Sequence, residues 1–158
     1  MARDAASLIA MLKGNDLGAR MEAALELGRM RAKAAVPALV EALGDREVSV
    51  LACWALGRIG DRKTVDRISV MLLSAKAPEE RHEAALALGR IGDARGVKTL
   101  ITALRKDKTP KVREECAEAL GNFGTPDVVS ALAKAVETDK SELVRLQAKK
   151  TLVELKLK

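Results

Sequence analysis

Residues 82–93 read His-Glu-Ala-Ala-Leu-Ala-Leu-Gly-Arg-Ile-Gly-Asp, and this stretch decides the fold because close copies of it return along the chain. The copies are EAALELGRM from residue 22, ACWALGRIGD from residue 52 and ECAEALGNFG from residue 115. Their central glycines are Gly28, Gly57, Gly89 and Gly121. A period of about thirty residues is typical of repeats that each form one helical hairpin.

A second phrase lies between these copies and predicts the other helix of each hairpin. Val36, Val65, Val97 and Val129 each precede apolar residues at the i+3 and i+7 positions, as in Val97, Leu100 and Leu104. This spacing places the three side chains on one face of an α-helix. We call it the A helix of each repeat, and we call the helix with the Ala-Leu-Gly phrase the B helix.

Together the two phrases predict an all-α fold, a right-handed α-solenoid of about five hairpins and ten helices. We expect a single repeat domain over residues 1–158, with repeats at about 3–31, 32–60, 61–92, 93–124 and 125–158. The expected A helices are about 4–13, 33–44, 62–74, 94–106 and 126–137. The expected B helices are about 19–30, 48–59, 79–91, 111–123 and 142–156.

Capping residues support these boundaries. Asp61 and Asp93 stand where a carboxylate would accept bonds from the first free amides of an A helix, and Thr125 offers a cap before Pro126. Ala32 is a weak cap at the same place in the second repeat. We interpret the glycine pair of Gly57-Arg58-Ile59-Gly60 as a helix stop in a left-handed conformation.

Composition agrees with an all-helical, intracellular chain. One Trp, one Phe and no Tyr leave little of the aromatic material that strands prefer. Cys53 and Cys116 fall two repeats apart, too far for a disulfide, so we expect a reduced, cytoplasmic protein. The first residues are too polar for a signal peptide and too short to cross a membrane, so we expect no membrane association.

The phrase from Val112 to Gly121 resembles the HEAT-repeat family, specifically the branch named after phycobilisome lyases. The resemblance covers almost the whole chain and implies that the A helices line the convex outside and the B helices the concave inside. It also implies a structural arginine row, here Arg20, Arg81, Arg113 and Arg145, with Ser49 breaking the row and Asp107 and Asp139 as partners. Proteins of this kind include bilin lyases, deoxyhypusine hydroxylases, DNA glycosylases and scaffolds without chemistry.

Under that arrangement the variable B-helix positions face the groove, and their side chains differ between the two halves of the chain. The groove row, as we name it, is Met21, Leu25, Val50, Leu51, Trp54, His82, Leu86, Glu114 and Glu118. Its first half is apolar and its fourth repeat is acidic. An apolar patch on a charged protein often marks an interface, with Trp as an anchor. We expect a partner helix, a peptide or a second copy of the chain to dock here; the alternative is that these residues only pack between successive B helices.

A basic rim is the second candidate site. Arg29, Arg58 and Arg90 follow the glycines in three consecutive repeats, and the net charge is +6. This favours contact with a nucleic-acid backbone as an alternative function. The scarcity of stacking aromatics and the groove glutamates argue against it. Cations are also favoured at helix C-termini for structural reasons alone.

The sequence predicts no set of residues that could act together in catalysis. Deoxyhypusine hydroxylases, which the repeat resembles, hold iron with four His-Glu pairs, and this chain has only His82-Glu83, so we expect no metal and no cofactor. With one histidine and both cysteines in packing positions, no nucleophile with a base can be assembled. We therefore expect a protein-interaction scaffold and not an enzyme, with a non-catalytic or chaperone-like subunit of a bilin lyase as a further alternative.

Overall fold

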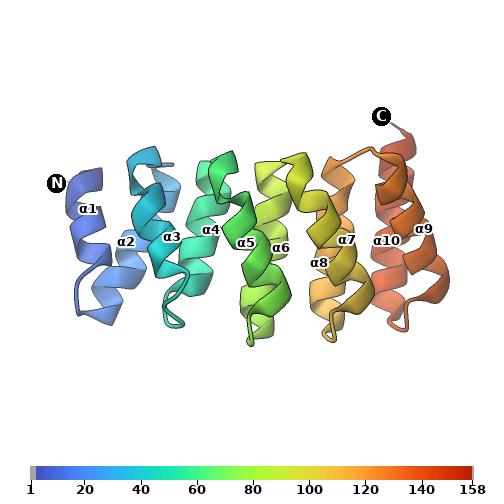
Figure 1. Cartoon of the computed structure of the whole chain (residues 1–158), viewed down its shortest axis with the longest axis horizontal. Coiled ribbons are helices and arrows are strands. Elements are labelled where there is room, and N and C mark those ends of the chain that lie inside the picture. Colours follow the sequence, from blue (N-terminus) through green and yellow to red (C-terminus); the bar gives the residue numbers. More distant parts are fainter. Residues whose placement is uncertain (1–2, 158) are drawn as a thin grey trace.

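The computed structural model describes residues 3–157, in which ten α-helices follow one another in a row (Figure 1). The odd-numbered helices are the A helices: α1 (Ala5–Leu12), α3 (Val36–Ala42), α5 (Val65–Ser74), α7 (Val97–Lys106) and α9 (Pro126–Thr138). The even-numbered helices are the B helices: α2 (Leu17–Arg29), α4 (Ser49–Ile59), α6 (Pro78–Ile91), α8 (Pro110–Ala119) and α10 (Glu142–Lys156). No strand occurs in residues 3–157, so the predicted all-α class is confirmed.

Short 3-10 turns account for most differences from the predicted bounds. Lys33–Ala35, Arg62–Thr64 and Ala94–Gly96 lead into α3, α5 and α7. The helix expected to run to residue 123 instead tightens after Ala119 into a turn over Leu120–Asn122. There the side-chain amide of Asn122 donates to the backbone carbonyl oxygens of Gly89 (3.2 Å) and Ala119 (3.3 Å).

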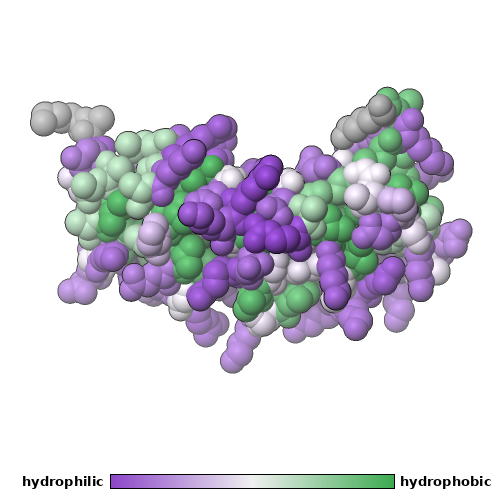
Figure 2. Space-filling model, turned by 45° about the horizontal axis from the view of Figure 1, so that its top comes forward, coloured by the Kyte–Doolittle hydropathy of each residue, from purple (hydrophilic) through white to green (hydrophobic). Residues whose placement is uncertain are grey.

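The helices form two layers of unequal spacing. Each even helix packs against the next along much of its length, whereas neighbouring odd helices touch far less. In Figure 1 the odd helices lie nearer the viewer and the even helices behind them. Closer spacing in the even layer bends the row towards that layer. The outline of the space-filling view is accordingly hollowed at its upper margin, between the two ends of the molecule (Figure 2).

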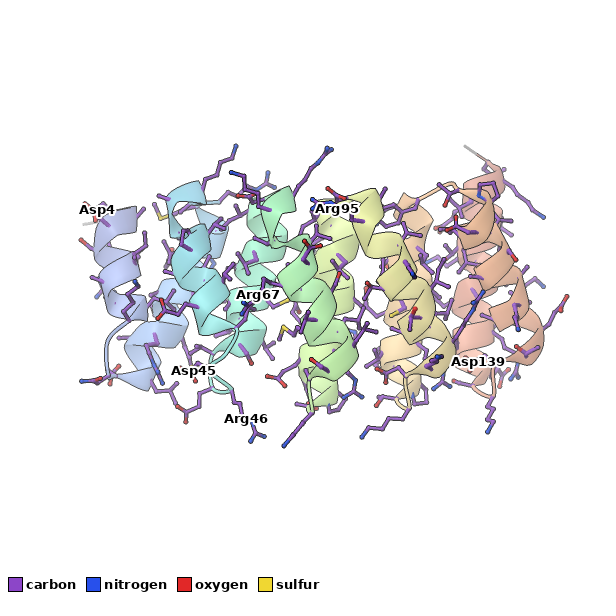
Figure 3. All side chains as sticks on the ribbon, viewed as in Figure 1. Asp4, Asp45, Arg46, Arg67, Arg95 and Asp139 are labelled. Atoms are coloured by element: carbon purple, nitrogen blue, oxygen red, sulfur yellow. The ribbon has the colours of Figure 1, made fainter. Side chains whose placement is uncertain are left out.

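The connections lie along two long edges of the row. The turns from odd to even helices, with Asp45, Arg46 and Asp139, lie along one edge, and Arg95 lies on the other, where even helices lead into odd ones (Figure 3). No helix within residues 3–157 has both the length and the apolar character that a bilayer span requires.

The core between the layers is built from leucine and alanine. The leucine before each glycine of the repeat phrase is buried, and so is the i+3 residue of the four A helices that carry the valine phrase: Leu27, Leu56, Leu88, Leu120, Leu39, Ile68, Leu100 and Leu132. Each fully buried side chain of this size contributes about 1.5–3 kcal/mol. Alanines and cysteines fill the remaining narrow positions, as Ala84, Ala85 and Cys116 do.

The repeat glycines bring successive even helices into near contact. A Cβ at Gly89 would lie 2.9 Å from the Cβ of Ala119, and one at Gly57 would lie 3.0 Å from the Cα and Cβ of Ala87. At Gly28 the same atom would come within 2.9 Å of the Cα of Ala55. These glycines lie inside or at the end of a helix, so the interpretation of the pair as a stop holds only for its second member.

That second glycine does end the even helices. Gly60 and Gly92 adopt φ values of 74° and 67°, and Asp61 and Asp93 cap the following turns by accepting from backbone amides. Arg31 occupies the equivalent place after α2 with a φ of 50°, which is uncommon for a residue with a side chain.

The Thr125 side chain makes no capping bond to the backbone of α9, unlike the prediction. Its hydroxyl bonds to the Asp127 carboxylate instead, and Pro126 starts the helix as expected. A proline at the first turn removes one amide that a cap would otherwise satisfy.

Arginine–aspartate pairs tie successive repeats together along the edge of Asp139. Arg81 binds Asp107 through two bonds of 2.7 and 3.1 Å, and Arg113 binds Asp139 at 2.8 and 2.9 Å. Each arginine therefore pairs with the aspartate of the next repeat. Arg113 also donates to the backbone oxygen of Asp107, the aspartate six residues before it (2.8 Å).

Between α4 and α6 the arginine–aspartate pair is missing, and both of its members are replaced. Ser49 stands where other repeats have arginine, and Ala75 stands six residues before Arg81, where Asp107 and Asp139 stand before their arginines. The Ser49 hydroxyl donates to Glu80 instead (2.7 Å). Because the arginine and the aspartate of this pair are both absent, neither is left buried without its partner between α4 and α6.

The glycine contacts predict the effect of adding one methyl group. Gly89→Ala should lower the free energy of unfolding by about 1–3 kcal/mol, because Ala119 must move away. Gly124→Ala is the matched control, since a Cβ there meets nothing within 4 Å. Urea unfolding of both variants measures the difference. Equal stability of the two variants would mean that the helices do not depend on this close approach.

Candidate functional site

The groove row lies on the even helices, and its members come from four successive helices. Met21 and Leu25 are on α2, and Val50, Leu51 and Trp54 are on α4. His82 and Leu86 follow on α6, and Glu114 and Glu118 on α8. Met21 and Glu118 are exposed and the other seven are half-buried, so the row is neither fully open nor sealed in the core.

The Trp54 side chain packs against the preceding repeat and also reaches the protein surface. A Cβ at Gly28 would come within 2.5 Å of the indole ring, so the ring lies directly over this glycine of the preceding repeat. The guanidinium of Arg58 lies 5.7 Å from the ring centroid, within range of a cation–π contact. The indole remains half-exposed, so part of it fills the joint between α2 and α4 and part faces solvent.

The C-terminal half of the groove is acidic, and two of its carboxylates are largely buried. Glu83 and Glu115 are the residues after His82 and Glu114, and their side chains are 13% and 12% exposed. Burial raises the pKa of both, from 4.5 to about 7. The nearest cation to Glu83 is Arg90, whose Nη1 lies 3.8 Å from its Oε1, and no hydrogen bond to this oxygen occurs within residues 3–157.

Neither residue belongs to the groove row, although both occupy the adjoining position of their helices. The sequence signal was a glutamate beside the row in two successive repeats. The sequence pattern did not predict how deeply the Glu83 and Glu115 side chains are buried.

His82 contacts this acidic cluster. Its Nε2 lies 3.2 Å from Oε2 of Glu115. Burial, followed by the nearby charge of Lys111, lowers the pKa of His82, while burial raises that of Glu115. Both shifts disfavour the charged forms, so the contact is weaker than an ion pair between two fully charged groups. Within residues 3–157 no three metal-binding side chains come together.

The basic rim residues are partly engaged within the chain. Arg29 pairs with Glu26 on its own helix, Arg90 approaches Glu83, and Arg58 lies against Trp54. The rim therefore has less free charge than the sequence alone indicates. Figure 2 shows hydrophilic residues gathered at the middle of the molecule. The exposed Arg62 and Arg95 belong to the turns that lead into α5 and α7.

Both cysteines are buried, unpaired and uncharged. Burial raises the pKa of Cys53 and of Cys116 above the usual thiol value. A thiol in that state is a poor nucleophile. The two residues fill small packing positions, which agrees with the place that the sequence assigns to them.

Comparison with known proteins identifies the family. The model for HEAT repeats matches residues 5–75 and 68–153, which together span most of the chain. This chain belongs to the HEAT-repeat family. No curated protein matches it at a significant level.

Two solved structures resemble this HEAT-repeat protein over its length. The complex of CpcE and CpcF of phycocyanin lyase from Nostoc sp. PCC7120 matches with a TM-score of 0.83 and 27% identity, covering 100% of this chain and 67% of that chain. An engineered protein matches with a TM-score of 0.69 and 23% identity, covering 98% of this chain and 80% of that one. The first match confirms the predicted resemblance to the phycobilisome-lyase branch, and the second supports the fold alone.

The two buried glutamates predict how the stability of the HEAT protein depends on pH. Their folded-state pKa lies above the unfolded value of 4.5, so between pH 4.5 and about 7 the folded state binds more protons. Their contribution to stability is therefore fully present below pH 4.5 and is lost as pH rises towards 7. Thermal melting of the double variant Glu83→Gln, Glu115→Gln should show a smaller loss of stability across this window than the wild type shows.

Glu137→Gln on α9 is the control, because that carboxylate is exposed and lies outside the groove. It should leave the wild-type pH dependence unchanged. A double variant that keeps the full wild-type slope would show that Glu83 and Glu115 titrate normally in the folded chain.

Proposed function

We propose that this HEAT protein is an interaction scaffold that binds an elongated protein or peptide partner along the groove row of its even helices. The observation that carries this proposal is that every member of the row, from Met21 on α2 to Glu118 on α8, is half-buried or exposed. Solenoids of this type use their concave surface for extended partners. The similar phycocyanin lyase structure is a complex of two proteins, which supports a protein as the partner.

The side chains of the groove define the chemistry of the partner. Met21, the most exposed apolar member of the row at 39%, begins a half that continues through Leu25, Val50 and Trp54. The other half carries the exposed Glu118 and the half-buried Glu114, whose carboxylate lies 3.2 Å from Nζ of Lys111, with the largely buried Glu83 and Glu115 in the adjoining positions. A matching segment is apolar where it meets α2 and α4 and carries lysine or arginine where it meets α6 and α8.

Binding of a basic segment would also change the state of the buried glutamates. A cation close to a carboxylate favours its charged form and lowers its pKa. A lysine or arginine placed against Glu83 and Glu115 therefore releases protons at neutral pH. Binding of a cationic partner should therefore strengthen as pH rises through 7, a dependence that a glutamate pair already ionised at neutral pH would not show.

A second candidate is a non-catalytic or chaperone-like subunit of a bilin lyase, and the likeness to the phycocyanin lyase complex favours it. In this role the groove of our chain would hold a lyase partner and the chemistry would lie elsewhere. Both candidates use the same surface, so the same variants test them.

Peptide selection tests the proposed groove. A random peptide library selected against the chain should yield sequences with apolar residues followed by basic ones. Fluorescence anisotropy should then show about tenfold weaker binding to the double variant Glu114→Lys, Glu118→Lys, a loss of ~1.4 kcal/mol from charge reversal.

The matched control is Glu137→Lys on α9, an exposed site in the odd layer. It changes the charge of a surface glutamate in the same direction but away from the groove, and it should weaken binding less than about twofold. Selected peptides without basic residues, or equal losses in both variants, would contradict the proposal.

A further inference from the structure

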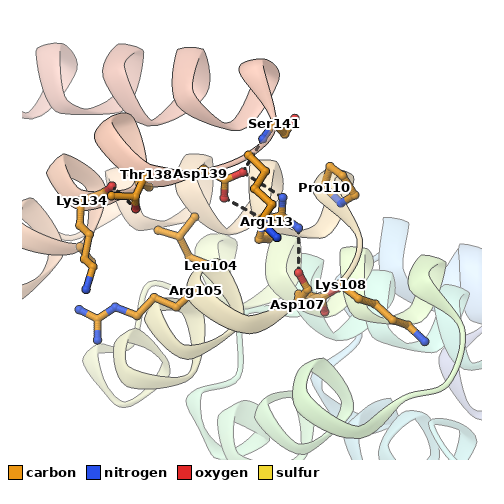
Figure 4. Close-up of a pocket in the computed structure, with 13 residues that line it drawn as sticks. Leu104, Arg105, Asp107, Lys108, Pro110, Arg113, Lys134, Thr138, Asp139 and Ser141 are labelled. Carbon is orange, nitrogen blue, oxygen red and sulfur yellow. Dashed lines mark hydrogen bonds and ion pairs between the residues drawn. The ribbon is translucent and has the colours of Figure 1, made fainter.

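A cleft opens between α7 and α9 at the edge where odd helices turn into even ones (Figure 4). Its volume is about 700 Å³, within the range of small-molecule sites in proteins. Leu104, Ala131 and Ala135 form an apolar floor, and all three are buried. The cleft exists because neighbouring odd helices are spaced more widely than even ones and because two of the three floor residues are alanines.

Both carboxylates that line the cleft are already neutralised. Asp107 is held by Arg81, and Asp139 by Arg113, each through two short bonds. Arg113, which also lines the cleft, is occupied by the same bond. A ligand would therefore meet no free negative charge from these two aspartates.

Four cations around the cleft have no such partner. Arg105, Lys108, Lys134 and Lys140 all line it and all are exposed. Within residues 3–157 no acidic side chain lies within 4 Å of their charged atoms. The cleft has an excess of positive charge that the chain itself does not use.

Arg105 and Lys134 are the pair best placed to act together. Figure 4 shows their charged ends extending in the same direction from α7 and from α9, while Lys108 points away from them. Two like charges on facing helices repel each other unless an anion lies between them. Arginine supplies a planar fork of donors and lysine a compact charge, a combination suited to phosphate or carboxylate oxygens.

We propose that this cleft is a binding site for a small organic polyanion, whose phosphate or carboxylate groups contact Arg105 and Lys134 and whose body lies over Leu104, Ala131 and Ala135. Lys108 and Lys140 raise the local positive potential. The site lies between odd helices and shares no residue with the groove row. This proposal is therefore independent of the partner proposed for the groove.

Isothermal titration of the full chain at low ionic strength tests the site, with inorganic pyrophosphate and citrate as the two probes. Arg105→Gln and Lys134→Gln should each weaken binding by about tenfold, the typical effect of removing one charge-assisted bond. Binding of pyrophosphate alone would assign phosphate chemistry, binding of citrate alone carboxylate chemistry, and either result supports the site.

Lys106→Gln is the matched control. It removes the same charge from the same helix, and Lys106 is exposed and does not line the cleft. It should weaken binding less than about threefold, through loss of long-range attraction alone. Absence of binding for both probes, or an equal loss in Lys106→Gln, overturns the proposal. Thermal melting verifies that the variants fold, which is expected because the exposed side chains of Arg105 and Lys134 make no hydrogen bond within residues 3–157.

Discussion

The near contact between a glycine of one even helix and an alanine of the next governs the shape of this protein. Gly57 against Ala87 and Gly89 against Ala119 leave no room for a Cβ at the glycine. The even layer is therefore tightly spaced, while neighbouring odd helices touch far less. One contact, repeated along the row, produces both the hollow face that carries the groove and the open spacing between α7 and α9.

Tight spacing also determines the electrostatics of the groove. The side chains of Glu83 and Glu115 are largely buried on the tightly spaced even helices, and this burial raises the pKa of both to about 7. The arginine–aspartate pairs on the edge differ from these glutamates, because each charge there has a partner in bidentate geometry. The arginine–aspartate pairs thus hold the repeats in register along one edge, while in the groove Oε1 of Glu83 has no hydrogen bond within residues 3–157.

Much of this architecture could be predicted from the sequence. Helix positions followed from apolar periodicity, and the caps Asp61 and Asp93 followed from local rules that depend on only a few neighbouring residues. Contacts between repeats were harder, because they depend on how far one helix lies from the next. The sequence comparison suggested Asp107 and Asp139 as partners of the arginines six residues later, but their carboxylates bind the arginines of the preceding repeat. The pattern also gave no sign that Trp54 would cover Gly28.

The central claim is that the groove is a binding surface and not only a packing seam, and Trp54, the only tryptophan of the chain, reports on it directly. The measurement is the tryptophan emission spectrum, and its quenching by acrylamide, during titration with a basic-apolar peptide selected against the chain. Our account predicts a shift to shorter wavelength and reduced quenching at saturation, because the exposed part of the indole becomes covered. Saturable peptide binding with unchanged emission and unchanged quenching would contradict it, and would place the partner on another face.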